Sequence, residues 1–465
     1  MQEVLELDPG RPCPPLDTPA RADVCIVGGG YTGLWTALEI RRRSPDSSVV
    51  VLEEDICGGG ASGRNGGFAT SWWDELPELI ERFGERHALV LAEATTRAIH
   101  EIGEFHESRG IAGYRQAGNI SMATCQAQVG KWRATLAALA KTGTRGRAEE
   151  LSGDEIRQRT GCPLALAGVL FPDGATVQPA FYARGLRAAA LEAGVRIYEH
   201  TPMLALRRDR PALIETPRGS VEADAVVLAT NAWLARLRDL RRAIVPVASY
   251  IVLTEPAPER IARIGWTGGE ALGDERLLVH YTHVTHDGRI AFGRGGGAIG
   301  PLGRVSWAME HDHRVVETVA RDFRRFFPEL ADLRLTHAWG GPIDRAPGHL
   351  PFAGSLAGAE HVRYVAGYSG NGVAPTRVGA QVLASLTLGE RDELTATGIA
   401  DGPPGYLPPE PLRSLGGVLV RTAVRRAEAA EERERAPDPI SRLGRKLVWA
   451  TTPRALEPRL RRRRD

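Results

Sequence analysis

Lysine is scarce in this sequence. Only three of its 59 basic residues are lysines, at positions 131, 141 and 446, so no role between residues 142 and 445 can fall to a lysine. The 57 acidic residues nearly balance the bases and leave a formal net charge of +2. A protein devoted to nucleic acid would usually be more basic, so nucleic acid is a disfavoured partner.

Cysteines are few and scattered, and long apolar runs are missing. The five cysteines contain no CxxC pair, which argues against a disulfide framework and a zinc site, so we expect no metal. No stretch of about 18 apolar residues could span a membrane. The acidic N-terminus MQEVLELDPG also lacks the apolar core of a signal peptide. We therefore expect a soluble protein of the reducing cytoplasm.

The overall composition is that of a folded globular chain. Apolar residues make up 43% and charged residues 25% of the 465 positions. These are ordinary values, and they exclude a largely disordered, collagen-like or coiled-coil protein. The length suggests two or three domains, or one elaborate α/β domain.

A strand, a glycine turn, a helix and a second strand follow one another over residues 24–54. The apolar runs 24–27 and 49–52 indicate the strands, and the apolar spacing between them indicates the helix. The turn is a G-x-G-x-x-G motif made of Gly28, Gly29, Gly30, Tyr31, Thr32 and Gly33, and Glu53 follows 20 residues after Gly33. Such a turn lets the backbone approach a pyrophosphate at a helix N-terminus, and an acid in this position binds a ribose. The pattern predicts a dinucleotide site.

A second glycine loop distinguishes between the possible dinucleotides. Residues 58–67 read GGGASGRNGG and begin five residues after Glu53. A domain that binds NAD has no need for such a loop, whereas a flavin ring must be held over a bed of backbone amides. We therefore expect FAD.

At this loop the sequence resembles a known family. The stretch GASGRNGG at 60–67 is similar to the flavin loop of the FAD-dependent D-amino-acid oxidase superfamily, and most of all to its γ-glutamylputrescine oxidase branch, which is related to glycine and sarcosine oxidases. The likeness continues in the family's order at FPDG (171–174), DAVVLATNA (224–232), WGG (339–341) and GYSGNGV (367–373). It implies an α/β fold with a discontinuous, glutathione-reductase-like FAD-binding Rossmann domain. A substrate domain with a mainly antiparallel sheet would complete it.

The resemblance also implies which residues contact FAD. The glycine turn would hold the pyrophosphate, Glu53 with its neighbour Glu54 the ribose, and Met203 the adenine. The remaining expected contacts are Gly60, Ala61, Ser62, Arg64, Asn65, Gly66, Gly67, Thr230, Asn231, Gly341, Gly370, Asn371, Gly372 and Val373. The last four would direct amides and a helix N-terminus at the N1–C2=O edge, where reduced flavin is anionic.

Residues 279–286 alternate along one expected strand of the substrate sheet. Tyr281 and His283 share one face, at a position where the family often has Tyr-x-Arg. We expect both to be catalytic residues that contact substrate, with His283 taking a proton from the substrate ammonium. The alternative is an ordinary, partly exposed polar strand.

Three further residues are candidates for substrate binding, and each has a second interpretation. Trp73 walls the substrate cavity or belongs to the core. Trp339 begins a family motif near the ring or is an ordinary packing residue. Arg345 pairs with a substrate carboxylate or is one of 56 arginines placed by chance.

Some chemistry of the family has no counterpart here. No cysteine lies beyond Cys162, and Asn65-Gly66-Gly67-Phe68 stands where other members attach flavin to a histidine, so FAD should be noncovalent. Sarcosine oxidases use a lysine over the flavin to reduce oxygen, and this chain offers none there. Either His283 or another cation acts on oxygen, or oxygen is not the acceptor.

The family implies oxidation of a C–N bond. Hydride would pass from the α-carbon of a primary or secondary amine or amino acid to flavin N5, the imine would hydrolyse, and O2 would take the electrons to give H2O2. Three alternatives remain: an FAD-dependent amine dehydrogenase that serves a quinone or carrier protein, a flavoprotein that acts on nucleic acid, and a non-catalytic flavin-binding protein. The oligomeric state is left open.

The expected organisation alternates between two domains. An N-terminal arm (1–21) precedes an FAD-binding domain (22–110, 168–235 and 336–395, with one long helix over 75–109), a substrate domain (111–167 and 236–335), and a Pro-rich linker with a basic tail (396–465). Between 421 and 465, 14 Lys or Arg outnumber seven Asp or Glu. Such a tail could contact an anionic membrane or a partner subunit; the alternative is a solvated terminus of no special role.

Overall fold

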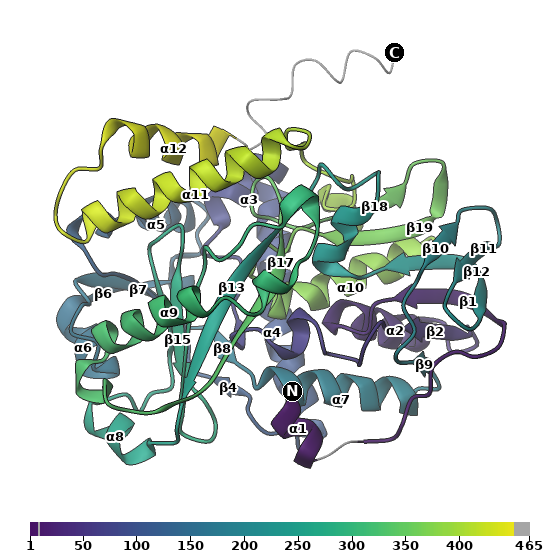
Figure 1. Cartoon of the computed structure of the whole chain (residues 1–465), viewed down its shortest axis with the longest axis horizontal. Coiled ribbons are helices and arrows are strands. Elements are labelled where there is room, and N and C mark those ends of the chain that lie inside the picture. The colour runs from purple at the N-terminus through teal and green to yellow at the C-terminus, as the bar shows by residue number, and fades with distance from the viewer. Residues whose placement is uncertain (8–9, 451–465) are drawn as a thin grey trace.

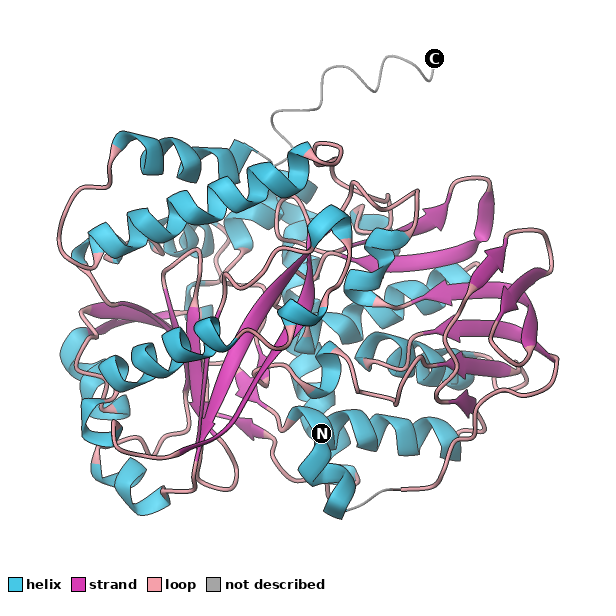
Figure 2. Cartoon of the chain, viewed as in Figure 1, coloured by secondary structure: helices cyan, strands magenta, loops and turns pink. Residues whose placement is uncertain are grey.

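Two eight-stranded sheets lie side by side and form the two halves of the protein (Figures 1 and 2). The computed structural model describes residues 1–7 and 10–450. A small third sheet has the order β3 (Phe68–Ala69), β8 (Ala175–Thr176) and β4 (Arg115–Gln116). Within the described residues, no helix is long and apolar enough to cross a bilayer.

The first sheet is built mainly of parallel strands. Its path is β10 (Ala205–Arg207), β11 (Ala212–Glu215), β12 (Ser220–Leu228), β1 (Ala20–Val27), β2 (Val49–Leu52) and β9 (Arg196–Tyr198), and β19 (Ala359–Ala366) with β18 (Phe352–Leu356) adds beside β12. β1 pairs in parallel with β2 and β12, and β19 does so with β12. The strands predicted at 24–27 and 49–52 are confirmed. They are apolar throughout because both faces of a parallel sheet are covered.

Helices cover this sheet and share its core. α2 (Tyr31–Arg43), α4 (Glu85–Ser108), α7 (Pro179–Glu192) and α10 (Val373–Leu388) contribute to one cluster with Val24 and Ile26, whereas Cys25 and Val27 belong to the cluster on the other face. This division follows the alternation of side chains along a strand. The long helix expected over 75–109 is in fact α3 (Leu76–Phe83) followed by α4. Gly84 between them has a φ of 79°, which no helix allows.

The second sheet is mainly antiparallel, as predicted. Its order is β17 (Leu335–Arg345), β13 (Val245–Thr254), β16 (Ile290–Arg294), β15 (His280–Val284), β14 (Ala271–Asp274), β5 (Asn119–Ala123), β7 (Ala167–Phe171) and β6 (Glu149–Ser152). β14 pairs with β5 in parallel, and the other neighbours pair antiparallel. α9 (His313–Phe326) packs Phe323 and Phe326 into the core under β13 and β16. Shorter helices α5 (Arg133–Lys141), α6 (Gly153–Thr160) and α8 (Pro258–Arg263) complete this half.

Two strands belong to a different sheet from the one their predicted segments imply. β7 lies within the expected FAD-binding segment 168–235, and β17 within 336–395, yet both pair in the antiparallel sheet. β17 ends next to the glycine loops and therefore runs from one half towards the other. The division of the chain into domains is otherwise a prediction.

The C-terminal segment differs from the separate tail that its composition suggested. Residues 412–450 form two helices, α11 (Leu412–Glu431) and α12 (Pro439–Ala450), which lie side by side along one edge of the protein (Figure 1). The basic cluster 461–464 and the rest of 451–465 lie outside the described residues. At the other terminus, the expected arm begins with a short helix, α1 (Gln2–Leu7).

Candidate functional site

The G-x-G-x-x-G turn lies at the carboxyl end of β1 and leads directly into α2. Gly28 has a φ of +110°, and a Cβ there would stand 2.6 Å from the Ala229 carbonyl oxygen. A Cβ on Gly33 would overlap the Gly28 carbonyl. These two positions therefore require glycine, because the turn is tight and the helix packs directly on it. Tyr31 begins the helix and Thr32 donates from its hydroxyl to Tyr368, 3.1 Å away.

Glu53 is fixed by backbone donors at the end of β2. Its two carboxylate oxygens accept hydrogen bonds from Gly29 N (2.7 Å) and Asp55 N (3.0 Å). Burial raises its pKa despite these bonds. The carboxylate therefore stands beside the glycine turn, where a ribose would reach it, whereas the neighbouring Glu54 is exposed.

The second glycine loop lies between the two sheets and is held from both sides. The Arg64 guanidinium pairs with Glu310 at 2.9 Å, and the Arg64 carbonyl accepts from Trp339 Nε1 at 2.8 Å. Asn65 closes the loop on itself by accepting from Gly67 N at 2.7 Å. On the side of the first sheet, Ser62 Oγ accepts from Tyr31 N at 2.8 Å. The loop is thus a rigid bridge from the start of α2 to β17.

Open space borders the glycine loops at two positions. A Cβ added to Gly60 or Gly341 would meet no atom within 4 Å, so both positions border open space. At Gly30 the added Cβ would stand 2.8 Å from Ser62 Oγ, which leaves no room for a side chain between helix and loop. Residues 60–66 are half-buried although they lie between the sheets. A cradle lined by backbone at a helix N-terminus is what FAD requires.

A third glycine loop stands at the start of α10. Ser369 and Gly370 have positive φ values of 56° and 101°, and Asn371 Oδ1 accepts from Thr70 Oγ at 2.8 Å. Gly372 immediately precedes Val373, the first residue of a 16-residue helix. The positive end of the α10 dipole therefore lies at this loop. That it faces the N1–C2=O edge of the flavin stays a prediction.

The segment after β12 lies under the first turn. The Thr230 methyl would stand 3.4 Å from a Cβ on Gly28, and Asn231 has a φ of 48° with its side chain bonded to Ala232 N. Met203 is half-buried and packs against the core on that face of the sheet. Thr230 thus lies against the base of the turn, and the contacts of Thr230, Asn231 and Met203 with FAD stay a prediction.

Tyr281 and His283 project from β15 towards the second glycine loop. A Cβ on Gly66 would meet the Tyr281 ring at 2.7 Å, and one on Gly67 would stand 3.3 Å from His283 Nε2. Phe68 makes edge contacts with both rings at centroid distances of 5.7 Å. The alternation along the strand thus brings both side chains to the loop, while His280 faces the other way.

The electrostatics of this pair follow from burial. The Tyr281 hydroxyl lies 2.7 Å from Ser249 Oγ, and burial raises the pKa of Tyr281 to about 12. His283 is 5% exposed, and burial lowers its pKa, although the carbonyls of Val284 and Gly66 act in the opposite direction. At neutral pH, His283 is therefore an uncharged base and Tyr281 an uncharged hydroxyl.

The three candidate substrate residues are not brought together. Trp73 is 2% exposed, donates from Nε1 to Thr96 at 2.9 Å and is covered by Arg147, so it belongs to the core and does not wall a cavity. Trp339 holds the flavin loop, as described above. Arg345 ends β17, with Nη2 3.3 Å from His349 Nε2.

Sequence reasoning missed two acids near Arg345. Asp74 and Glu75 follow the tryptophan pair, and burial raises their pKa values to about 7 and about 8. The Glu75 charge opposes the effect of burial on Arg345, whose pKa is lowered. Two adjacent acids soon after the flavin loop were the available signal, but only the fold places them near residue 345.

No cluster of three or more His, Cys, Asp or Glu in residues 1–7 and 10–450 is arranged to hold a metal ion. The five cysteines are free and buried, and Cys57 packs under the first glycine turn, with Sγ 2.5 Å from the position of a Gly29 Cβ. Cys25 and Cys57 are thus buried small residues.

Comparison with known proteins agrees with this geometry. Residues 23–386 match the DAO family, described as FAD dependent oxidoreductase. The chain is 30% identical over 400 residues to a probable oxidoreductase OrdL of Rhizobium meliloti. The matched region covers 83% of this chain and 88% of that protein. It is 28% identical over 384 residues to gamma-glutamylputrescine oxidoreductase of Escherichia coli, covering 80% and 85%. A solved structure of glycine oxidase from Geobacillus kaustophilus shares the fold, with a TM-score of 0.62 at 22% identity over 80% of this chain and 96% of that one. The chain therefore belongs to the DAO family of FAD-dependent oxidoreductases.

Proposed function

We propose that this chain oxidises a C–N bond of a primary or secondary amine or amino acid. The observation that carries the proposal is the position of Tyr281 and His283, which reach from the second sheet to Gly66 and Gly67 of the flavin loop. Bound FAD would accept the hydride of the substrate α-carbon at N5, and the resulting imine would hydrolyse. A relative named gamma-glutamylputrescine oxidoreductase supports an amine substrate.

In this proposal, His283 takes the proton that an ammonium substrate must lose. Its Nδ1 lies 3.1 Å from the Val284 carbonyl, and the Gly66 carbonyl is its second neighbour. A neutral imidazole carries one N–H, so it can donate to only one of these carbonyls and keeps a free lone pair on the other nitrogen. Once His283 has accepted a proton, the carbonyls of Val284 and Gly66 stabilise the charged imidazolium, since both act to raise the pKa of His283.

Arg345 is the residue that would recognise a substrate carboxylate. It lies at the end of β17, two residues beyond Ile343, whose Cδ1 stands 3.2 Å from the position of a Gly370 Cβ. Positions 343 and 345 share one face of the strand, so Arg345 lies on the side of the third glycine loop. An arginine here supports an amino acid, or an amine that carries a carboxylate, as substrate.

FAD is expected to be held without a covalent bond. Ser62 and the first turn of α2 would bind the pyrophosphate, Glu53 the ribose, and the loops at 60–67 and 369–372 the ring. Each cysteine of the chain is buried, and Asn65 to Phe68 offer no nucleophile for attachment. Acid precipitation should therefore release FAD, and a precipitate that stays yellow would contradict noncovalent binding.

An amine dehydrogenase is the second candidate. A neutral His283 supplies no fixed positive charge to oxygen, and the chain has no lysine between 142 and 445. These facts favour a quinone or a carrier protein over O2 as the acceptor. The peroxide formed per turnover separates the two candidates: one H2O2 per imine supports the oxidase.

Anaerobic reduction of the flavin tests the proposal directly. The holoenzyme is mixed with polyamines, N-methyl amino acids and D-amino acids, and the flavin absorbance is followed. Bleaching by at least one amine is expected, and failure of the whole panel contradicts amine oxidation. Arg345→Gln should raise KM for a carboxylate substrate while it leaves the KM of an amine without a carboxylate unchanged.

A further inference from the structure

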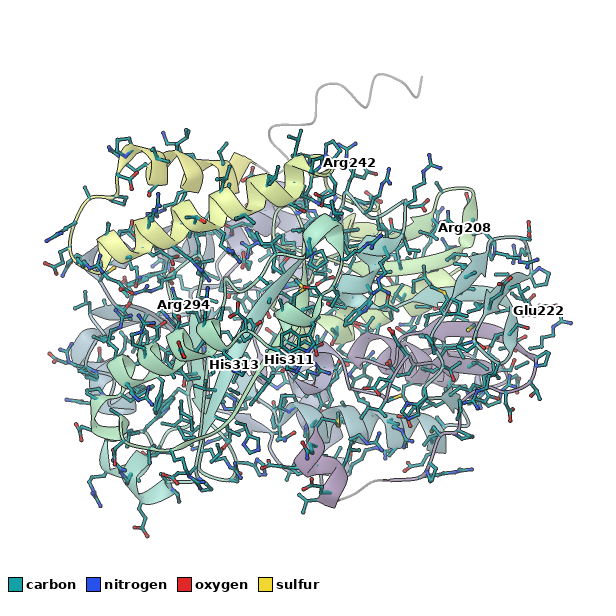
Figure 3. The ribbon with its side chains drawn as sticks, viewed as in Figure 1. Arg208, Glu222, Arg242, Arg294, His311 and His313 are labelled. Atoms are coloured by element: carbon teal, nitrogen blue, oxygen red, sulfur yellow. The ribbon has the colours of Figure 1, made fainter. Side chains whose placement is uncertain are left out.

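One face of α11 anchors the C-terminal helices to the rest of the protein. Arg421 and Arg425 each donate to a carbonyl of the loop after β16, at Gly297 and Gly296, both at 2.5 Å. Glu428 accepts from Leu278 N at 3.1 Å, and Glu432 pairs with Arg325 at 3.0 Å and with Arg276. Arg242, labelled in Figure 3, donates to the Leu407 carbonyl at 2.9 Å just before the helix. The helices are a fixed part of the fold.

α12 packs antiparallel on α11 through small residues. A Cβ on Gly444 would clash with Ala423, so the two helices are in close contact there. Arg445 pairs with Glu431, and Asp438 caps the start of α12 by accepting from Ser441 N at 3.0 Å. The relative rotation of the two helices is thereby set, and so is the surface that they present.

That surface is apolar. Leucines at 412, 415 and 419 recur at helical spacing on α11, and apolar residues at 440, 443 and 447 recur in the same way on α12. We call the following set the apolar hairpin face: Leu412, Leu415, Val418, Leu419, Ile440, Leu443 and Leu447, with exposed fractions from 43% to 73%. An amphipathic helix normally turns such a stripe inward, so this one is available to an apolar partner.

The exposed charges on the two helices themselves are basic. The acids of the two helices are engaged, since Glu428 and Glu432 bind the body and Glu431 binds Arg445. Arg426, Arg442 and Lys446 are exposed beside the leucines. The partner must therefore be apolar and anionic at once.

We propose that the apolar hairpin face binds the surface of an anionic lipid bilayer. A helix that lies in the plane of a membrane interface typically has exposed leucines next to basic residues, and the apolar hairpin face has both. A second copy of the chain fits less well, because a two-fold interface on this face would bring the exposed basic residues of both copies, Arg442 and Lys446 among them, into one interface without exposed acids on the two helices to pair with them. The inference does not depend on the reaction proposed above.

Vesicle co-sedimentation of the full-length holoenzyme tests the proposal. Wild type should bind vesicles of phosphatidylglycerol and phosphatidylcholine at low salt, and far less at high salt, because exposed charges are screened within about 10 Å at 0.1 M. The double variant L443E/L447E should bind at least about tenfold more weakly, since an apolar face drives interfacial insertion. R442E/K446E should also weaken binding, and pure phosphatidylcholine should bind little.

Leu7→Glu is the matched control. Leu7 is 75% exposed on α1, which lies at the opposite edge of the molecule from α11 and α12 (Figure 1). It should bind like wild type, and the flavin absorbance reports that each variant is folded. The proposal is overturned if wild type ignores anionic vesicles or if L443E/L447E binds as wild type does. It is also overturned if light scattering shows a dimer that L443E/L447E converts to a monomer.

Discussion

The two sheets contribute different kinds of groups to the site. The parallel sheet offers mainly backbone, from the glycine turn at residues 28–33 and the start of α10, and one side chain, the Glu53 carboxylate held by amides. The antiparallel sheet offers side chains, since Tyr281, His283 and Trp339 reach across to the loop at 60–67. Backbone contacts suit a cofactor common to a large family, whereas side chains can change from one member to the next. We therefore expect cofactor binding to be sensitive to the first sheet and chemistry to the second.

Gly30→Val should have the largest effect. Its Cβ would stand 2.8 Å from Ser62 Oγ, and the remaining methyl groups would enter the space in which the pyrophosphate binds. The purified variant should be colourless, as measured by flavin absorbance per protein.

Gly146→Val is the control for this substitution. A Cβ at Gly146 meets nothing within 4 Å. The residue lies in the short turn just before β6 of the antiparallel sheet. It should retain a full complement of FAD. A yellow Gly30→Val protein would show that the turn does not contact the cofactor.

The glycine turns could be predicted because their information is local. The residues that form each turn lie within about ten positions of one another in the sequence. Close packing at Gly28 and Gly33 permits no other residue type. The face shared by Tyr281 and His283 was also predictable, since it follows from strand alternation. What they contact was not, because β15 meets the loop at 60–67 only through the register of a sheet assembled from distant segments.

Trp73 and the C-terminal helices are features that could not be predicted from the sequence. A tryptophan after a flavin loop fits either a cavity wall or a core, and only the contacts with Thr96 and Arg147 decide for the core. The composition of a segment rich in arginine and glutamate is typical of a solvated tail. In the structure, however, Glu432 forms an ion pair with Arg276, whose side chain is only 2% exposed. Partners more than a hundred residues away leave no trace in local composition.

His283→Ala should be next in size. Removing a general base typically slows the assisted step about 10²–10⁴-fold, so reduction of the flavin by amine should slow by this factor while FAD content stays normal. Stopped-flow measurement under anaerobic conditions follows it. Since burial lowers the pKa of His283, the wild-type contribution should persist above pH 6.5 and vanish only as the pH falls through this lowered value.

His286→Ala is the control for His283. His286 follows on the same stretch of chain but is exposed, so its loss should leave the reduction rate near that of wild type. Equal rates of flavin reduction in the two variants would show that His283 only packs. They would contradict the proposal that this side chain of the second sheet acts as the general base.

Asp322→Asn should have a smaller effect, on stability. On the face of β15 away from the flavin loop, His280 bonds Asp274 at 2.7 Å and Asp322 at 3.0 Å, and Asp322 also pairs with Arg294 at 2.5 Å. These contacts hold the pKa of Asp322 at about 2 and raise that of His280. The lowered value for Asp322 corresponds to about 2 kcal/mol of unfolding free energy at neutral pH.

The pH dependence gives this prediction its sign. The Asp322 contribution is complete above about pH 4 and is lost as the pH falls towards 2, while the His280 contribution is complete below about pH 6.5 and is lost as the pH rises through its raised value. Urea unfolding of Asp322→Asn should therefore approach wild type in strong acid and differ most between pH 4 and 6.5. Asp332→Asn, which removes an exposed pair with Arg260, should leave the urea midpoint close to that of wild type at every pH.

Removal of residues 1–7 should have the smallest effect, and it tests whether the first sheet's backbone alone holds the cofactor. The Met1 side chain lies against Gly58 and Gly63 of the flavin loop, and Glu3 is 3.3 Å from His337 Nε2 in the second sheet. Both members of that ion pair are about half exposed, so it contributes at most about 1 kcal/mol. FAD affinity should fall by less than about tenfold, which corresponds to 1.4 kcal/mol, when measured by reconstitution of the apoprotein. Glu3→Gln should leave the affinity unchanged, because the packing of Met1 remains. If the truncated protein is colourless instead, α1 closes the cofactor site and binding of FAD depends on a side-chain contact as well as on glycine turns.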